Sequence, residues 1–267
     1  MASRKIITFN KGSLLTKAML EEMEQFPKVM LELTYTDYSD GIISGIKIAN
    51  NALGQSVLSK GILKHNGKYY FLTEDILLTP YLETLIMEKE YVLILKDQEK
   101  VTLCEGIEEE SLTLSVSTRE EVSSNDFVLG SFLHTSSRHL VLADELEQVN
   151  HLSYFDVSEV KYAFKKQATF VPEYFELIKK KLMTKTGQHP MDMILLNAIF
   201  EKEVVSYEWL GYYIETVIGK KPDMTDRKDV MRKLIEAVYK PYEVTTINAP
   251  QEKVVSGNVR KVKPGLI

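Results

Sequence analysis

Closely spaced glycines are the first residues in this chain that could do chemistry, because such glycines can cradle a phosphate. The stretch Y-S-D-G-I-I-S-G-I-K-I covers residues 38–48 and contains Gly41 and Gly45. A phosphate-binding loop lies between a strand and a helix, and the N-terminus of that helix holds the anion. Here the strand-like I-K-I follows Gly45. We therefore predict that these glycines are corners of short strands, with no nucleotide site.

The histidines and the single cysteine could bind a metal, but their spacing does not favour it. The five histidines are His65, His134, His139, His151 and His189. None of them forms the i, i+4 pair of a helical zinc site, and one cysteine cannot form a Cys-x-x-Cys motif. His134 and His139, on either side of T-S-S-R, are the best pair, and ordinary surface histidines are the alternative interpretation. We predict no metal and no cofactor.

Nucleophilic and acid–base chemistry have no clear carriers either. The G-x-S-x-G motif of a nucleophilic serine is absent. Cys104 lies in a predicted strand, which is typical of a buried, unreactive thiol. Four acidic residues could pair for acid–base work, although carboxylates at strand ends are commonly turn formers; they are Asp37, Asp40, Glu74 and Asp75. The sequence predicts no catalytic residue, and an enzyme whose site is assembled from distant residues stays open as an alternative.

Composition sets the class of molecule. The chain has 267 residues, 44% of them apolar, and a formal net charge of −5. This is typical of a globular protein and provides no overall basic field to attract nucleic acid. The lone cysteine, together with the absence of an apolar signal-like run near the N-terminus, predicts synthesis in the cytoplasm. No apolar run approaches the length of a membrane span.

The N-terminal half has the pattern of one helix followed by many strands. Apolar residues at spacings of three and four predict a helix over 14–26, capped by Thr16 and ended by Pro27. Residues 29–35 could form a second short helix. Residues 40–72 predict three strands and two turns, the second of them at Asn66-Gly67, the strongest short hairpin signal.

Strands continue beyond this hairpin. Thr79-Pro80 predicts the start of a short helix, and four further strands are expected at 91–95, 100–107, 111–116 and 126–133. Residues 138–166 are compatible with either strand or helix.

After Phe170 the apolar period changes to that of helices. Four helices are predicted, beginning at Pro172 and Pro190 and after Ser206 and Thr225. The fold class is therefore α+β, with a β-rich N-terminal domain, a short leading helix, a small C-terminal helical bundle and an extended C-terminal arm. We expect the domain boundaries at 1–165, 166–245 and 246–267.

Two segments could contact protein partners. The helix after Ser206 is aromatic and acidic, so Trp209, Tyr212 and Tyr213 could either fill the core of the bundle or form part of an interface. The basic C-terminal arm could add a strand to the sheet edge of another subunit; its candidate residues are Val255, Val259, Arg260 and Val262. A tail without a fixed structure is the alternative.

Residues 14–72 also resemble a known kind of module. L-L-T (14–16) and a helix come first, then D-G-I-I-S-G-I-K-I (40–48) and S-K-G-I-L-K-H-N-G-K-Y-Y-F-L (59–72). This order resembles the N-terminal module of baseplate and fibre-attachment proteins of phage tails and contractile injection systems. The predicted helical domain is not part of that resemblance.

The resemblance implies a non-enzymatic structural subunit, made in the cytoplasm and incorporated into a tail-like particle. Its partners would be other protein subunits, with no nucleic acid, membrane span or small-molecule substrate. The alternative is an intracellular regulator that binds nucleic acid through its helical domain, where K-K-K (179–181) and R-K (232–233) supply positive charge.

Overall fold

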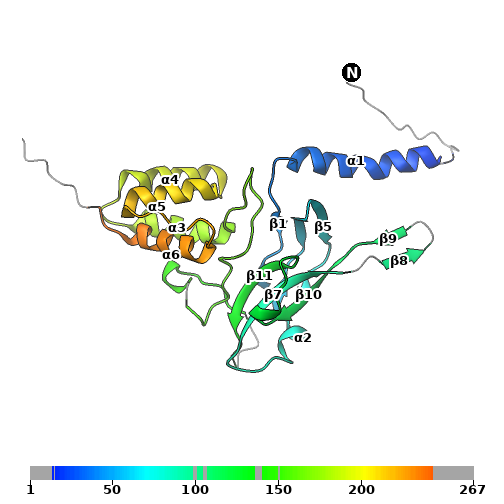
Figure 1. Cartoon of the computed structure of the whole chain (residues 1–267), viewed down its shortest axis with the longest axis horizontal. Coiled ribbons are helices and arrows are strands. Elements are labelled where there is room, and N and C mark those ends of the chain that lie inside the picture. The colour runs from blue at the N-terminus through cyan, green and yellow to red at the C-terminus, as the bar shows by residue number, and fades with distance from the viewer. Residues whose placement is uncertain are drawn as a thin grey trace, which may run out of the picture.

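The computed structural model describes residues 14, 16–98, 101–104, 107–135, 140–149 and 151–242. β-Sheets occupy the N-terminal part and four helices the C-terminal part, so the predicted α+β class is confirmed. The predicted C-terminal arm, 246–267, lies outside the described residues. The helical bundle lies at one end of an elongated molecule, and helix α1 extends at the other (Figure 1).

Helix α1 spans Lys17–Tyr35 and corrects the prediction that Pro27 ends it. Thr16 caps the helix as predicted, since its hydroxyl accepts a hydrogen bond from the Met19 amide at 3.3 Å. Pro27 removes one intrahelical hydrogen bond. Strong helix formers on both sides of it, and a position at the surface where a bend meets no packed neighbour, let the helix continue. The expected second helix over 29–35 is the second half of α1.

The glycine-containing stretch forms strands, as predicted, but five of them and not three. The strands are β1 (Gly41–Gly45), β2 (Ile48–Asn50), β3 (Ser56–Leu58), β4 (Gly61–His65) and β5 (Lys68–Leu72). Each of the first two predicted runs is divided, because the chain turns at Ile46 and again at Ser59-Lys60 to change sheets. Asn66 and Gly67 both have positive φ, 51° and 75°, as a type I′ turn requires.

The described strands form three antiparallel sheets of three strands each and one two-stranded hairpin. In one, β4 lies between β1 and β5; in another, β3 lies between β2 and β6 (Ile76–Leu77). The third has β7 (Glu90–Asp97) between β10 (Leu112–Ser117) and β11 (Phe127–Leu133). The predicted strand 100–107 instead contributes to a hairpin of β8 (Val101–Cys104) and β9 (Ile107–Glu109). Short helix α2 (Thr79–Leu82) begins at Thr79, one residue earlier than predicted.

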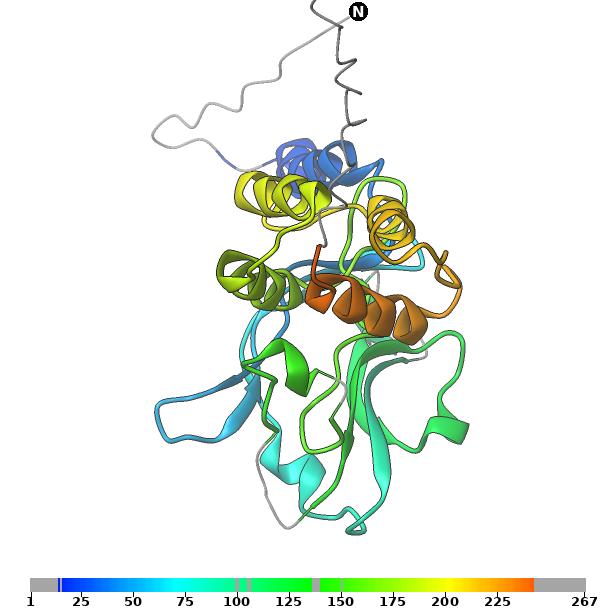
Figure 2. The ribbon, with the colours of Figure 1, turned by 90° about the vertical axis from the view of Figure 1, so that its left-hand side faces the viewer.

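Residues 140–170 connect the sheets to the bundle, with a single turn of 3-10 helix at η2 (Leu146–Gln148). The four predicted helices follow and are confirmed: α3 (Pro172–Thr184), α4 (Pro190–Lys202), α5 (Tyr207–Ile218) and α6 (Arg227–Tyr239). Ser206 caps α5 and Gly219 ends it in the left-handed conformation. Asp226, and not the expected Thr225, caps α6. Figure 2 looks onto this end of the molecule, with the bundle in front.

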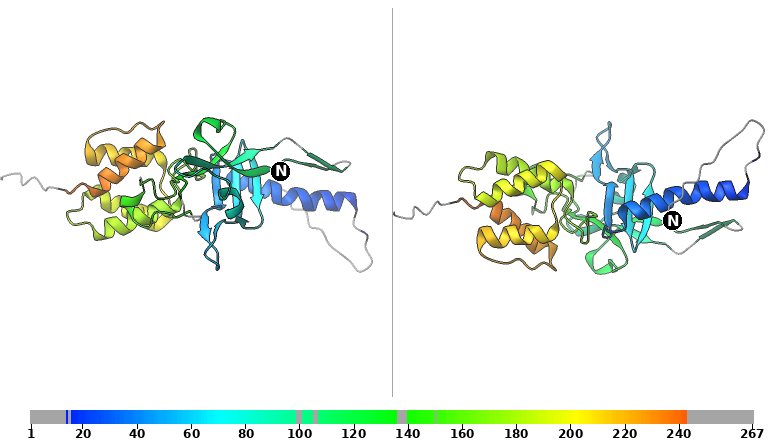
Figure 3. Two further views of the ribbon diagram at one scale, coloured as in Figure 1. Left: turned by 90° about the horizontal axis from the view of Figure 1, so that it is seen from below. Right: turned by 90° about the horizontal axis from the view of Figure 1, so that it is seen from above.

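The hydrophobic core runs without interruption from the sheets into the bundle. Leu58 and Leu93 of the sheets, Phe170 of the connection, and Phe175 and Leu234 of the helices belong to the same packed cluster. Figure 3 shows α1 and the β8–β9 hairpin extending from the sheets on the side away from the bundle. Helix α1 contributes no buried residue to the cluster among the residues described.

Candidate functional site

An uncovered apolar surface runs along α1. Phe26 is 67% exposed, Leu33 72%, and Met23 and Met30 are each 48% exposed. Four exposed residues at spacings of three and four fall on one side of a helix. Leu20 and Val29, also exposed, widen this apolar face. Soluble monomers rarely expose a contiguous apolar stripe of this kind, so the face is a candidate interface.

The C-terminal end of α1 is fastened to the sheets through a different side of the helix. Lys64 on β4 donates to the carbonyl oxygens of Tyr35 at 3.1 Å and Tyr38 at 2.8 Å. The rings of Tyr35 and Tyr38 meet edge to face. Burial, followed by the nearby charge of Glu32, raises the pKa of Tyr69 on β5. Glu32 and Tyr35 therefore lie on the side of α1 that faces the sheets, and the apolar face points elsewhere.

The aromatic residues predicted on α5 occupy three different environments. Tyr212 is 59% exposed, Trp209 is half-buried and Tyr213 is fully buried. Trp209 stacks on Tyr213 with ring centroids 5.9 Å apart. The Tyr213 hydroxyl donates to the buried carboxylate of Asp192 at 2.7 Å, and burial raises the pKa of this hydroxyl. Tyr212 is thus the predicted residue that a partner could reach directly.

Sequence reasoning missed a further exposed patch on α4. Met193, Ile194 and Phe200 are exposed although the opposite side of the helix, with Leu195 and Ile199, is buried in the core. The signal was present in M-D-M-I-L-L-N-A-I-F, where eight of ten residues are apolar. A helix with apolar residues on more than one side cannot bury all of them against one neighbour. Val255, Val259, Arg260 and Val262 of the predicted arm lie outside the described residues.

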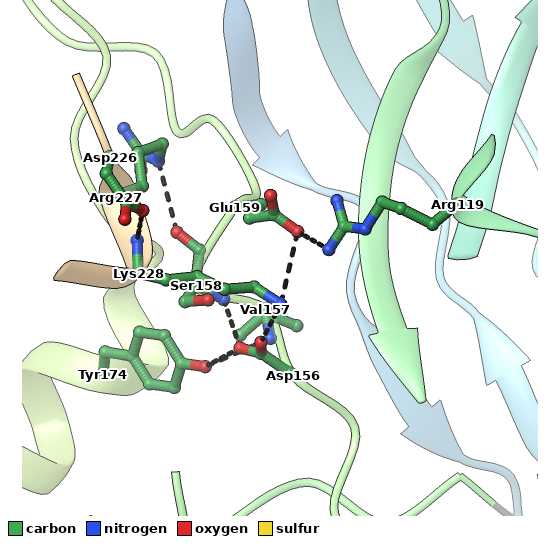
Figure 4. A network of polar contacts seen from close by, with 9 residues as sticks. All are labelled: Arg119, Asp156, Val157, Ser158, Glu159, Tyr174, Asp226, Arg227 and Lys228. Carbon is green, nitrogen blue, oxygen red and sulfur yellow. Dashed lines mark hydrogen bonds and ion pairs between the residues drawn. The ribbon is translucent and has the colours of Figure 1, made fainter. Parts of the chain in front are cut away.

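A cluster of polar contacts around Arg227, here called the polar joint, links the connecting segment before α3 to α6. Figure 4 shows part of it from close by. Arg227 donates to the carbonyl oxygens of Ser158 (3.2 Å), Val160 (3.0 Å) and Thr169 (2.7 Å). Its guanidinium lies 4.7 Å from the Phe170 ring and 5.0 Å from the ring of Tyr207. Desolvation lowers the pKa of Arg227. Sequence reasoning missed this residue because its partners are distant in the chain.

Charged side chains surround this joint. Lys228 lies 3.5 Å from Asp156 and 3.7 Å from Glu159, and Arg119 also pairs with Glu159. The Tyr174 hydroxyl donates to Asp156 at 3.2 Å. These paired groups join the β10–β11 connection, the 156–159 segment and two helices, which is an arrangement suited to positioning and not to proton transfer.

Three of the residues considered for chemistry have structural partners. Asp40 accepts hydrogen bonds from the amides of Asn66 (2.8 Å) and Gly67 (3.2 Å), and so stabilises the type I′ turn. Asp75 accepts one from the Lys60 amide at 2.8 Å. The buried ring of His65 lies 2.8 Å from the Asn125 carbonyl oxygen.

His134 is buried, and His139 lies outside the described residues. Within the described part of the chain no three His, Cys, Asp or Glu side chains gather as a metal site would require.

One apolar cavity of about 240 Å³ lies where the sheets meet α3. Ile42, Leu58 and Val157 contribute to its walls, and Lys47 lies 3.9 Å from Glu173 at its edge. The lining, within the described residues, holds no Ser, Thr, Cys or His side chain. Of the helices in the described residues, none combines the length and apolar composition needed to cross a membrane.

Comparisons with known proteins give weak likenesses. No family model matches the chain, and no curated protein matches it. Among solved structures, the chain is similar to one titled "Crystal structure of TssK", at 8% identity and a TM-score of 0.36, over 90% of this chain and 70% of that one. Another is a chain of the "type VI secretion system TssK-TssF-TssG baseplate subcomplex", at 9% identity and a TM-score of 0.31, over 89% and 98%. Likenesses with TM-scores this low establish neither a shared fold nor a shared function.

Proposed function

We propose that this chain is a non-enzymatic structural subunit of a phage-tail-like particle, such as a baseplate, and acts through protein–protein contacts. The observation that carries the proposal is the uncovered apolar face of α1. Leaving Phe26 and Leu33 in water forfeits about 1.5–3 kcal/mol each relative to burial. A helix that extends from the molecule with such a face is suited to joining another protein. The resemblance of residues 14–72 to baseplate modules supports the kind of particle.

Incorporation of the tagged full-length chain into a high-mass particle in its native source tests the proposal. We expect Phe26→Gln to move the chain from the particle into the free pool, because the substitution removes apolar area from the face. Gln25→Ala is the matched control, since Gln25 is an exposed neighbour in the same helical turn. A wild-type chain found only in the free pool, or equal incorporation of both variants, would contradict the proposal.

The C-terminal arm supplies a second contact in this proposal. Removal of residues 248–267 deletes the apolar and basic positions that could add a strand to a neighbouring sheet. We expect weaker incorporation of the truncated chain into the high-mass particle, measured by the same incorporation assay. Unchanged incorporation would remove the arm from the proposal and leave the role of α1 standing.

A further inference from the structure

Five apolar residues on α1 follow the spacing of a helix that packs along another helix. Met19, Met23, Phe26, Met30 and Leu33 are separated by four, three, four and three residues. This average of 3.5 keeps side chains on one line along two helices that wind around each other. We call these five residues the apolar seam.

Charged residues lie off the seam. Lys17 pairs with Glu21 at 3.7 Å and Lys28 with Glu24 at 2.7 Å, both one turn apart along the helix. Positions beside the seam carry Leu20, Pro27, Val29 and Thr34, and position 22 is acidic. Across a parallel, in-register pair the counterpart of position 22 is Pro27. Two copies of α1 can therefore approach without bringing like charges together.

The contacts at its C-terminal end leave most of α1 without stabilisation from the rest of the chain. Helix α1 has 19 residues with proline in its interior, and none of its seam residues belongs to the packed core of the described part of the chain. Isolated helices shorter than about 12–15 residues are marginal in water, and an interior proline costs about 3 kcal/mol. Pro27 divides α1 into two halves that are each shorter than this. Packing of the seam against another helix offsets this cost.

We infer that the occupant of the seam is a second copy of this chain, whose α1 packs parallel and in register. A parallel register sets each of the five seam residues against its own counterpart, whereas the antiparallel registers leave seam residues at one end without an apolar opposite. Helix α1 extends from the sheets on the side away from the bundle (Figures 1 and 3), so its N-terminal part lies clear of the bundle. This inference rests on the proposed function and names one of its protein partners.

Sedimentation equilibrium of the full chain tests the association. We expect a mass that is a multiple of 30.6 kDa, reduced to 30.6 kDa in the double variant Met23→Gln/Met30→Gln. The control is Glu24→Gln/Gln25→Ala, which changes the same turns off the seam and keeps the wild-type mass. Because α1 lies outside the core, circular dichroism should show the remainder of the fold intact in both. A wild-type chain that is monomeric at high micromolar concentration overturns the inference.

Disulfide cross-linking tests the orientation. In a Cys104→Ser background, Met30→Cys places one thiol opposite its counterpart in a parallel pair, and oxidation should yield a covalent dimer. Gln25→Cys, off the seam, should give at least tenfold less. Equal cross-linking of the two variants, or efficient cross-linking only in a mixture of Met23→Cys and Leu33→Cys chains, overturns the inference.

The two proposals fail separately. A monomeric chain whose incorporation still depends on Phe26 overturns self-association and leaves the structural role. A self-associating chain that never enters a particle overturns the structural role and leaves self-association standing.

Discussion

At the scale of single residues, the glycines that raised the possibility of a phosphate site are required for close backbone approach. Gly45 has φ +63°, and a Cβ there would lie 2.1 Å from the Lys60 carbonyl oxygen. The residue pairs directly with Gly61 across β1 and β4. Nothing in this arrangement leaves backbone amides pointing into an open loop for an anion.

We expect Gly45→Ala to destabilise the fold by more than about 3 kcal/mol, since it combines backbone strain with a clash that needs the backbone to move. Gly54→Ala is the matched control, because Gly54 also has positive φ (+74°) but an added Cβ would meet nothing within 4 Å. Its cost should be only the left-handed strain of about 1–2 kcal/mol. Urea unfolding of the two variants measures the difference, and equal losses would count against the clash.

Asp229 gives the fold a specific acid sensitivity. Its carboxylate accepts from Lys233 at 2.8 Å, from the Asp223 amide at 3.0 Å, and from Arg232. These bonds hold the pKa of Asp229 well below its ordinary value. The stabilisation is therefore fully present above the ordinary carboxyl pKa of about 4 and is lost as the pH falls below it.

We expect Asp229→Asn to lower the free energy of unfolding by about 1–3 kcal/mol at pH 6 and by progressively less toward pH 3. The measurement is urea unfolding of both proteins across this range, where only the difference between them is diagnostic because other carboxylates also titrate. A difference that stayed constant from pH 6 to pH 3 would refute the role of Asp229.

At the scale of elements, the structure of α1 differs from what local sequence rules predict. Pro27 predicted a helix end, yet both halves of α1 continue through it.

We expect Pro27→Ala to restore the missing hydrogen bond and slow amide exchange throughout α1, with the global unfolding temperature unchanged because the helix lies outside the core. Hydrogen-exchange mass spectrometry compares the variants. Faster or unchanged exchange in α1 would show that the proline costs this helix nothing.

The helices of the bundle could be predicted because each carries its own start signal. Pro172, Pro190 and Ser206 mark helix starts by local chemistry alone. The changes of sheet at Ile46 and Ser59-Lys60 could not be predicted, since they depend on which strands pair at long range. Met19, Met23 and Phe26 of the seam were visible as helical spacing, but their exposure was not, because sequence period does not say whether a face is covered. Trp209, Tyr212 and Tyr213 looked equivalent for the same reason.

At the scale of the whole molecule, the sheets and the bundle share one core, and Arg227 fastens the connection between them. A lysine cannot replace Arg227, because its ammonium is a point charge without the planar fork of N–H donors. The rings of Phe170 and Tyr207 would also lose their contact with the flat guanidinium. The predicted boundary between residues 165 and 166 lies within this connection and stays a prediction. Coupling across the connection is what decides whether the two parts unfold together.

We expect the wild-type chain to unfold in one cooperative transition, and Arg227→Met to cost about 3 kcal/mol or more, because it leaves several carbonyl oxygens without their donor. Arg227→Lys should recover only part of this.

Arg232→Ala is the control: the Arg232 side chain is 69% exposed on the same helix, and a surface ion pair contributes about 0–1 kcal/mol. Calorimetry with intrinsic fluorescence of Trp209 measures both quantities. If Arg227→Met separates the transition into two, with the bundle melting apart from the sheets, Arg227 is the coupling residue; if it costs no more than Arg232→Ala, the shared apolar core alone joins the halves.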